Sequence, residues 1–104
     1  MYHQVASKLA LTTDYQYSQA LSMQGANGAL IEITVISAGT ADYMLKYSND
    51  LQNWTDYDTT DYTLAGPGYE TEPLTGISAG YVRLQYKARS GTVIVAAGVN
   101  TANL

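Results

Sequence analysis

The sequence contains no cysteine and a single histidine, His3, among its 104 residues. Without cysteine there is neither a disulfide framework nor a thiolate ligand, and one histidine cannot build a multi-histidine metal site. The chain also lacks a glycine-rich phosphate-binding loop and a G-x-S-x-G nucleophile motif. We therefore expect no metal and no cofactor.

Charged residues are scarce as well. They make up 13% of the chain, with a net charge of −4, against about 25% in typical globular domains. Nucleic acid is not an expected partner, because phosphate binding needs a basic face. No apolar run reaches the ~18 residues of a membrane-spanning helix, so membrane insertion is not expected. The first residues show no cationic stretch followed by an apolar one, so no secretory signal is visible.

The length is that of one domain, and we expect residues 1–104 to form a single unit whose polar ends, 1–7 and 100–104, extend outward. Apolar and polar residues alternate with period two in several segments, which predicts half-buried strands. The stronger strand candidates are 30–36, 42–48, 81–89 and 92–99, and the weaker ones are 4–11, 15–23, 54–58 and 61–64. Turns are expected between them, including Ala38-Gly39 and Gly66-Pro67-Gly68. This pattern predicts an all-β fold, a single antiparallel β-sandwich of seven or eight strands that is jelly-roll-like.

Segment 92–99 is apolar on both faces, since Val93, Val95 and Val99 alternate with Ile94 and Ala96. We expect Ile94 and Ala96 to lie in an oligomer interface. Arg83 and Lys87 are added to this interface because charge is uneven along the chain: residues 42–72 hold seven carboxylates and 73–104 hold three cations. The acidic part would meet the basic part either on a neighbouring subunit or within the same chain.

Aromatic and acidic residues are concentrated between positions 54 and 72. Their rings either stack on sugar rings or close one end of the core; the residues concerned are Trp54, Tyr57, Tyr62 and Tyr69. Glu70 and Glu72 alternate onto one strand face like a glycosidase pair, but general acid catalysis needs a cleft that desolvates one carboxylate. A sandwich of this size rarely encloses such a cleft, so we do not expect an enzyme.

Two segments carry a resemblance to a known family: YMLKYSNDLQNWTDY at 43–57 and GYVRLQY at 80–86. Together they resemble the hairpin and late strand of discoidin-type (coagulation factor 5/8 C-like, galactose-binding-like) β-sandwich domains, over about residues 41–97. The chain is shorter than that family and lacks its usual cysteine pair. The resemblance implies a sandwich that binds carbohydrate or a surface. It also implies that Arg83 is a structural cation and Trp54 a core or hairpin residue.

The function expected from these observations is that of a non-enzymatic structural or assembly protein. Examples are a virion decoration, a head or tail component, or a surface-lattice subunit acting through protein–protein contacts. Its partner would be itself, as a homo-oligomer, or a larger protein scaffold, and its location a virion or another extracellular assembly. The alternative is a non-catalytic carbohydrate-binding module whose partner is a glycan.

Overall fold

The computed structural model describes residues 1–103, which form eight strands and no helix. Every pair of neighbouring strands is antiparallel. The predicted all-β antiparallel class and the number of strands are thereby confirmed. In chain order the strands are β1 Tyr2–Leu11, β2 Gln16–Tyr17, β3 Leu21–Ser22, β4 Gly28–Ser48, β5 Thr55–Asp56, β6 Tyr62–Leu74, β7 Tyr81–Ala88 and β8 Val93–Ala102. No helical segment within residues 1–103 has the length and hydropathy of a membrane span.

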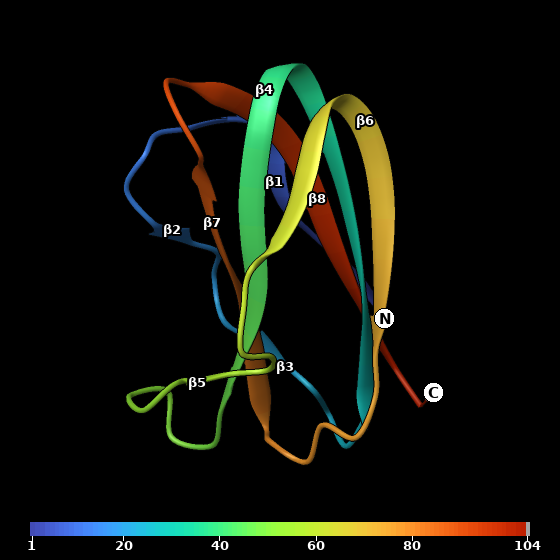
Figure 1. The fold of residues 1–104 in the computed structure, drawn as a ribbon. Helices are drawn as coiled ribbons and strands as arrows, with labels where there is room; N and C mark the ends of the chain where they lie inside the picture. Colours follow the sequence, from blue (N-terminus) through green and yellow to red (C-terminus); the bar gives the residue numbers. More distant parts are fainter. Residues whose placement is uncertain (104) are drawn as a thin grey trace.

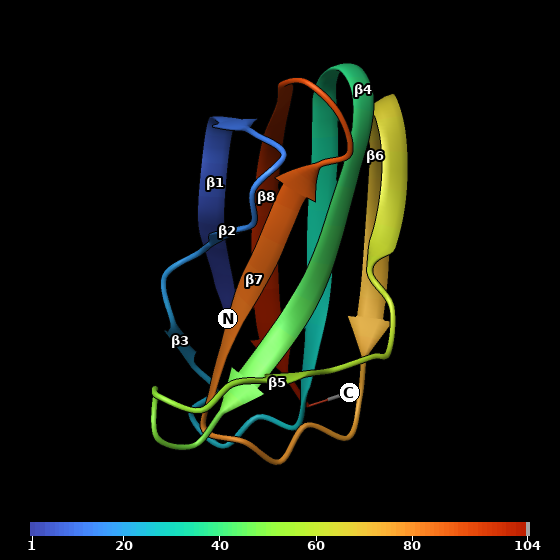
Figure 2. The same cartoon turned by 60° about the vertical axis from the view of Figure 1, so that its left-hand side comes forward.

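The two long strands, β4 and β6, fold the sheet back on itself. Both rise, turn over at one end of the molecule and descend again (Figure 1). Residues 28–35 of β4 pair with β8 and with the end of β6, whereas residues 41–48 pair with β7 and β5. We call the layer of β1, β8, 28–35 and 68–74 the first layer. The layer of 41–48, β7, 62–65 and the short strands β2, β3 and β5 is the second layer (Figure 2).

The bend lies where turns were predicted, and that prediction was wrong. Ala38-Gly39 and Gly66-Pro67 fall inside continuous strands, with Gly39 opposite Gly66 in the β4–β6 ladder. Candidates 30–36 and 42–48 are therefore two halves of one strand. Glycine is required because a Cβ on Gly66 would overlap Val35 and the Ser37 carbonyl, and one on Gly39, at φ +117°, would lie 2.8 Å from Val93.

The polar ends do not extend outward. Tyr2 pairs with Asn100 where β1 lies beside β8, and the Met1 amino group donates a hydrogen bond to the Thr101 carbonyl. Leu104, the last residue of the predicted extended end, lies outside the described residues. Of the other weak candidates, 15–23 contains only the two-residue strands β2 and β3.

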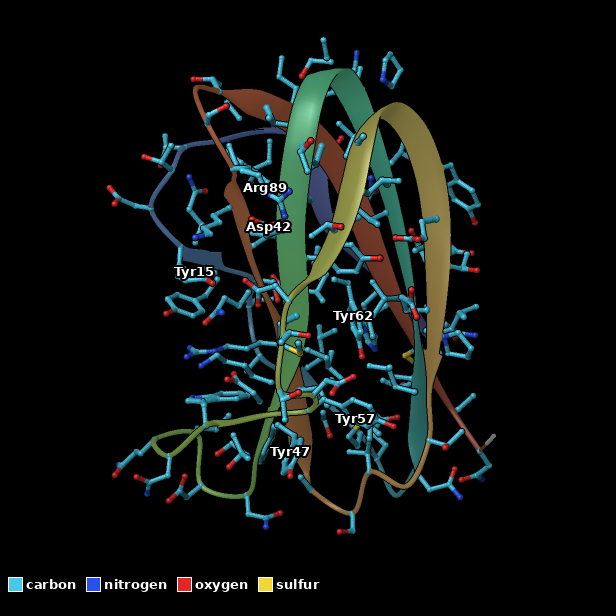
Figure 3. The ribbon with its side chains drawn as sticks, viewed as in Figure 1. Tyr15, Asp42, Tyr47, Tyr57, Tyr62 and Arg89 are labelled. Atoms are coloured by element: carbon cyan, nitrogen blue, oxygen red, sulfur yellow. The ribbon has the colours of Figure 1, made fainter. Side chains whose placement is uncertain are left out.

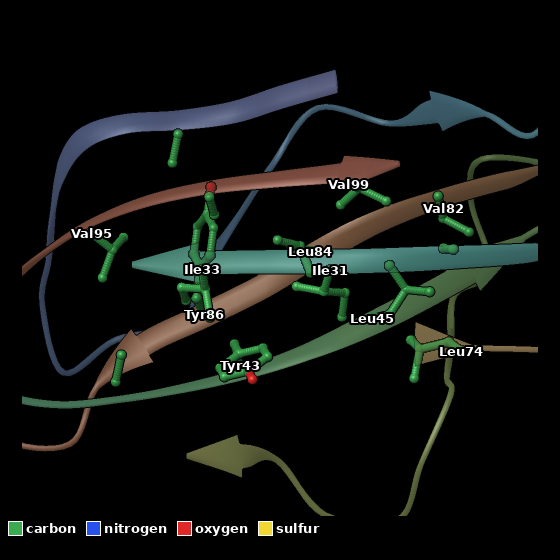
Figure 4. Packing of buried hydrophobic residues seen from close by; sticks show 14 of the residues in the cluster. Ile31, Ile33, Tyr43, Leu45, Leu74, Val82, Leu84, Tyr86, Val95 and Val99 are labelled. Atoms are coloured by element: carbon green, nitrogen blue, oxygen red, sulfur yellow. The ribbon is translucent and has the colours of Figure 1, made fainter. Parts of the chain in front are cut away.

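The core lies between the two layers. Inward-facing side chains of the first layer, such as Ile31, Ile33 and Val99, meet those of the second, such as Leu45 and Leu84 (Figure 4). All of these are at most 1% exposed. The predicted inward faces of 30–36, 42–48, 81–89 and 92–99 are confirmed, because local alternation correctly assigned each residue to one side of its strand.

Replacing the corner glycine should destabilise the protein strongly. We expect Gly66→Ala to cost about 1–3 kcal/mol or more of unfolding free energy, since the added methyl must displace Val35 and backbone atoms of the neighbouring strand. Urea denaturation measures the effect. Gly80→Ala is the matched control, because its Cβ would find its nearest neighbour, Asn49 Oδ1, at 3.9 Å. Equal stability of the two variants would contradict this account of the corner.

Candidate functional site

The four residues predicted to form one interface lie on two opposite faces of the molecule. Ile94 and Ala96 alternate with the buried Val93 and Val95, so they point away from the core on the outside of the first layer. Arg83 and Lys87 alternate with buried residues of β7, which places them on the outside of the second layer. A neighbouring molecule can therefore contact all four residues only if it contacts both faces.

The outside of the first layer carries little charge and no segment crosses it; we call it the tyrosine surface. It includes outward-facing residues of β1, β8, β4 and β6: Tyr2, Gln4, Glu32, Thr34, Ile36, Tyr69, Thr71, Ile94 and Ala96. Tyr69 is 61% exposed, Tyr2 53% and Ile94 37%. Strand β8 is thus covered by the core on one side, and on the other side the Tyr2 ring covers it at Gly98.

A shallow hollow of about 90 Å³ lies on the tyrosine surface, lined in part by Tyr2, Gln4, Glu32 and Tyr69. The Tyr2 ring lies against Gly98, where any Cβ would overlap it. Across the hollow, the Tyr69 hydroxyl donates a hydrogen bond to Glu32 Oε1 at 3.3 Å. Glu32 is in no ion pair among residues 1–103.

The outside of the second layer carries cations stacked on rings; we call it the cation–aromatic surface. The Arg83 guanidinium lies between the Tyr17 ring, 4.3 Å from its Cζ, and the Trp54 ring, 4.2 Å away. Lys87 Nζ is 4.7 Å from the centre of the Tyr15 ring. These contacts hold loops 12–20 and 49–54 against β7, each worth about 0.5–2 kcal/mol.

Hydrogen bonds and ion pairs complete this surface. The Tyr15 hydroxyl donates to Asp61 Oδ2 at 2.5 Å, and this bond raises the pKa of Tyr15 to about 12. Arg89 pairs with Asp42 at 2.9 Å (Figure 3), and Lys46 pairs with Asp56 at 3.1 Å. The Arg89–Asp42 pair joins the acidic and basic parts of the sequence within one chain.

Arg83 stands apart from these pairs. It forms no ion pair or hydrogen bond through its side chain in the part of the chain described, and its buried Nε has no acceptor. A buried N–H without a partner costs about 1–3 kcal/mol. Lys87 likewise has no carboxylate partner among residues 1–103, so the surface presents two uncompensated cations.

The four rings of the predicted sugar platform are dispersed. Trp54 covers Arg83 and donates from Nε1 to the Leu51 carbonyl at 3.3 Å, so it folds over the predicted hairpin turn. The Tyr57 hydroxyl donates to the Thr75 carbonyl at 2.8 Å. Tyr62 packs at 5.5 Å on the buried Tyr43, and burial raises its pKa to about 12. Tyr69 lies on the other layer, on the tyrosine surface. Figure 3 places Tyr57 and Tyr62 within the fold.

Glu70 and Glu72 face inward from β6. The Tyr43 hydroxyl donates to Glu70 Oε2 at 2.6 Å, which links the two layers. Burial, followed by the negative charge of Glu70, raises the pKa of Glu72. Neither of the two hollows described here includes these carboxylates.

The second hollow, of about 220 Å³, lies at the hairpin after β4 and is lined by Tyr47, Ser48, Asn49, Asp50, Asn53 and Thr55. Asp50 accepts hydrogen bonds from the backbone N–H groups of Asn53 and Gln52, and these bonds hold its pKa well below the usual range. Both hollows are smaller than the roughly 300 Å³ at which small-molecule sites begin. Residues 1–103 contain no group of three or more histidine, cysteine or acidic side chains placed to hold a metal ion.

Solved structures share this fold. The SPBc2 prophage-derived protein YomS matches with a TM-score of 0.62 at 9% identity, over 95% of this chain and 90% of that protein. No protein-family model and no curated protein sequence matches the chain. The resemblance to discoidin-type domains is not tested by these comparisons and stays a prediction.

Tyr2, Tyr17 and Glu32 belong to these surfaces but were not among the predicted site residues. The outward position of Glu32 was visible in the alternation of 30–36, where it faces away from Ile31 and Ile33. Nothing local to Tyr17 indicates its contact with Arg83, because 66 positions separate the two residues.

The half-buried position of Glu72 predicts a pH dependence of stability. Its pKa is raised in the folded state, so above the ordinary value of about 4.3 the folded chain binds more protons than the unfolded one. This contribution to stability is present at acid pH and declines as pH rises through that window. We therefore expect Glu72→Gln to be more stable than wild type at pH 7, with the difference shrinking toward pH 4.

Urea denaturation between these pH values measures the difference. Asp14→Asn removes the same charge from an exposed loop and is the control for net charge. A Glu72→Gln variant that is equally destabilised at both pH values would show that the carboxylate is stabilised by its surroundings instead.

Proposed function

We propose that this protein is a non-enzymatic structural component of a phage-type assembly, such as a virion decoration or a head or tail protein. It acts through protein–protein contacts, in a virion or another extracellular assembly. The observation that carries the proposal is the tyrosine surface, an uncovered outer face with two exposed tyrosines, two exposed isoleucines and little charge.

The composition of this surface suits a protein interface. The centres of interfaces are depleted in charge and enriched in tyrosine. Along β8, β1 and the neighbouring parts of β4 and β6, Glu32 is the one carboxylate that alternation places outward in the middle of the face. Desolvating such a surface costs little, and its rings and aliphatic groups supply contact area.

The edges of the first layer disfavour the other common route to association, strand addition. β1 has register shifts between Gln4 and Ala6 and again between Ala6 and Leu9. β6, the opposite edge, contains Pro67 and Pro73 and points Glu70 inward. Bulges, prolines and inward charges are the devices that keep sheet edges from pairing. Association is thus directed to the faces.

The fold supports the phage context, because YomS, which has a similar fold, is described as prophage-derived. At 9% identity this likeness concerns the fold, and the role in assembly rests on the surface itself.

A lysine on the tyrosine surface should prevent association. We expect the purified wild type to form oligomers in native mass spectrometry, and Ile94→Lys to remain monomeric, because a buried ammonium without a partner is costly. Ser78→Lys is the control, because it places the same ammonium in the exposed loop before β7, outside both surfaces. A wild type that stays monomeric up to millimolar concentration, or equal effects of both lysines, would contradict the proposal.

The alternative function, a non-catalytic carbohydrate-binding module, is favoured by one observation. The hollow of the tyrosine surface brings two exposed rings together with hydrogen-bonding groups from Gln4, Glu32 and Thr34. The resemblance to discoidin-type domains supports the same alternative. Of the predicted platform residues, Tyr69 alone lies at this hollow.

Alanine substitutions separate this alternative from the first proposal. If a glycan binds at the hollow, Tyr69→Ala should abolish its binding on a glycan array with an unchanged melting temperature, because the ring is exposed. Tyr62→Ala should instead lower stability by about 3 kcal/mol, since that ring packs against the core. The absence of any glycan bound by wild type would rule the alternative out.

A further inference from the structure

We propose that copies of this chain stack front to back, with Glu32 on the tyrosine surface of one copy binding Arg83 on the cation–aromatic surface of the next. The inference rests on the proposed assembly function and adds to it the partner, a second copy, and the mode of contact. Three features of the two faces lead to it.

The first feature is the preorganisation of Arg83. Its guanidinium lies over two rings, with Cζ 4.3 Å from the centre of the Tyr17 ring and 4.2 Å from that of the Trp54 ring, and these contacts restrict its position. Nε is buried, so the terminal nitrogens Nη1 and Nη2 are the groups left to bind a carboxylate in the plane. Tyrosine, tryptophan and arginine are also the residues that most often dominate binding energy at protein interfaces.

The second feature is the complementary charge on the opposite face. Glu32 lies near the middle of the tyrosine surface, has no cation partner among residues 1–103, and is fixed by the Tyr69 hydroxyl. Arg83 and Lys87 have no carboxylate partner in the same part of the chain. The unmatched negative charge on one face and the unmatched positive charges on the other thus become paired when two copies meet face to back.

The third feature is the size of the faces. The molecule measures 37 × 24 × 22 Å, so its broad face spans at most about 890 Å², close to the roughly 800 Å² that each partner buries in a stable interface. Because the two patches lie on opposite faces, the contact is heterologous: each copy keeps one face free for another. Such a contact builds a ring or an open filament and never a closed two-fold dimer.

Variants that reverse the charge of Glu32 or Arg83 test this contact, and the experiment needs no other molecule. We expect Glu32→Arg and Arg83→Glu each to weaken association about tenfold or more in analytical ultracentrifugation, because like charges then meet across the contact. Neither variant should assemble by itself. An equimolar mixture of the two should assemble, since every contact in an alternating stack again pairs Arg with Glu. The chain carrying both substitutions should also assemble.

Two controls guard against trivial effects. Ser78→Arg adds a positive charge in the exposed loop before β7, outside both surfaces, and should leave association unchanged. Arg83→Glu removes a cation from between two rings, so its melting temperature is measured first. If that variant is unfolded, Arg83→Gln replaces it, and the expected result is weaker association that Glu32→Arg does not restore.

The outcomes separate this inference from the proposed function. Association that survives both charge reversals, or a wild type that closes as a dimer, overturns the front-to-back contact and leaves an assembly protein that uses other groups. A mixture that fails to assemble when each folded variant alone is monomeric also overturns it. A wild type that is monomeric at every concentration overturns both.

Discussion

The joint bend of β4 and β6 is the constraint on which the rest of the structure depends. The two strands pair on both sides of the bend, with a register shift between Val35 and Gly39, while both cross from one layer to the other. The crossing requires glycine at Gly66, close to Val35 and the Ser37 carbonyl, and at Gly39, close to Val93. The bend sets the halves of β4 against each other, so that Ile33 and Leu45 share one core. It also leaves the molecule with two outer faces made from the same strands.

These two outer faces differ because the chain covers only one of them. Loops 12–20 and 49–54 lie across the second layer, where stacking on Arg83 and Lys87 secures them. No segment crosses the first layer, so its rings and isoleucines remain in water. The proposed front-to-back contact would bring this uncovered face of one copy onto the face of the next copy on which Arg83 and Lys87 form no ion pair among residues 1–103.

The success and failure of prediction have separate physical causes. Alternation correctly identified the inward side chains of β7 and β8, because burial of every second residue is a local property of a strand. The signals at Ala38-Gly39 and Gly66-Pro67 were read as turns, because glycine and proline mark any sharp change of direction, including a bend within a paired strand. The stacking of Tyr17 on Arg83 was beyond reach, since it depends on where two distant loops are anchored.

By itself, the sequence determined the strand content, the side of each strand that faces the core, and the scarcity of charge and of metal ligands. Each of these depends on residue type and on period-two spacing, which are local. Tertiary structure alone decided that Ile94 and Ala96 lie on one outer face while Arg83 and Lys87 lie on the other, and that the predicted ring platform is divided between the layers. It also decided that Asp42 of the acidic segment forms an ion pair with Arg89, the residue that follows β7. Spacing assigns a residue to one side of its own strand, but the layer to which that strand belongs is set by long-range pairing across the bend.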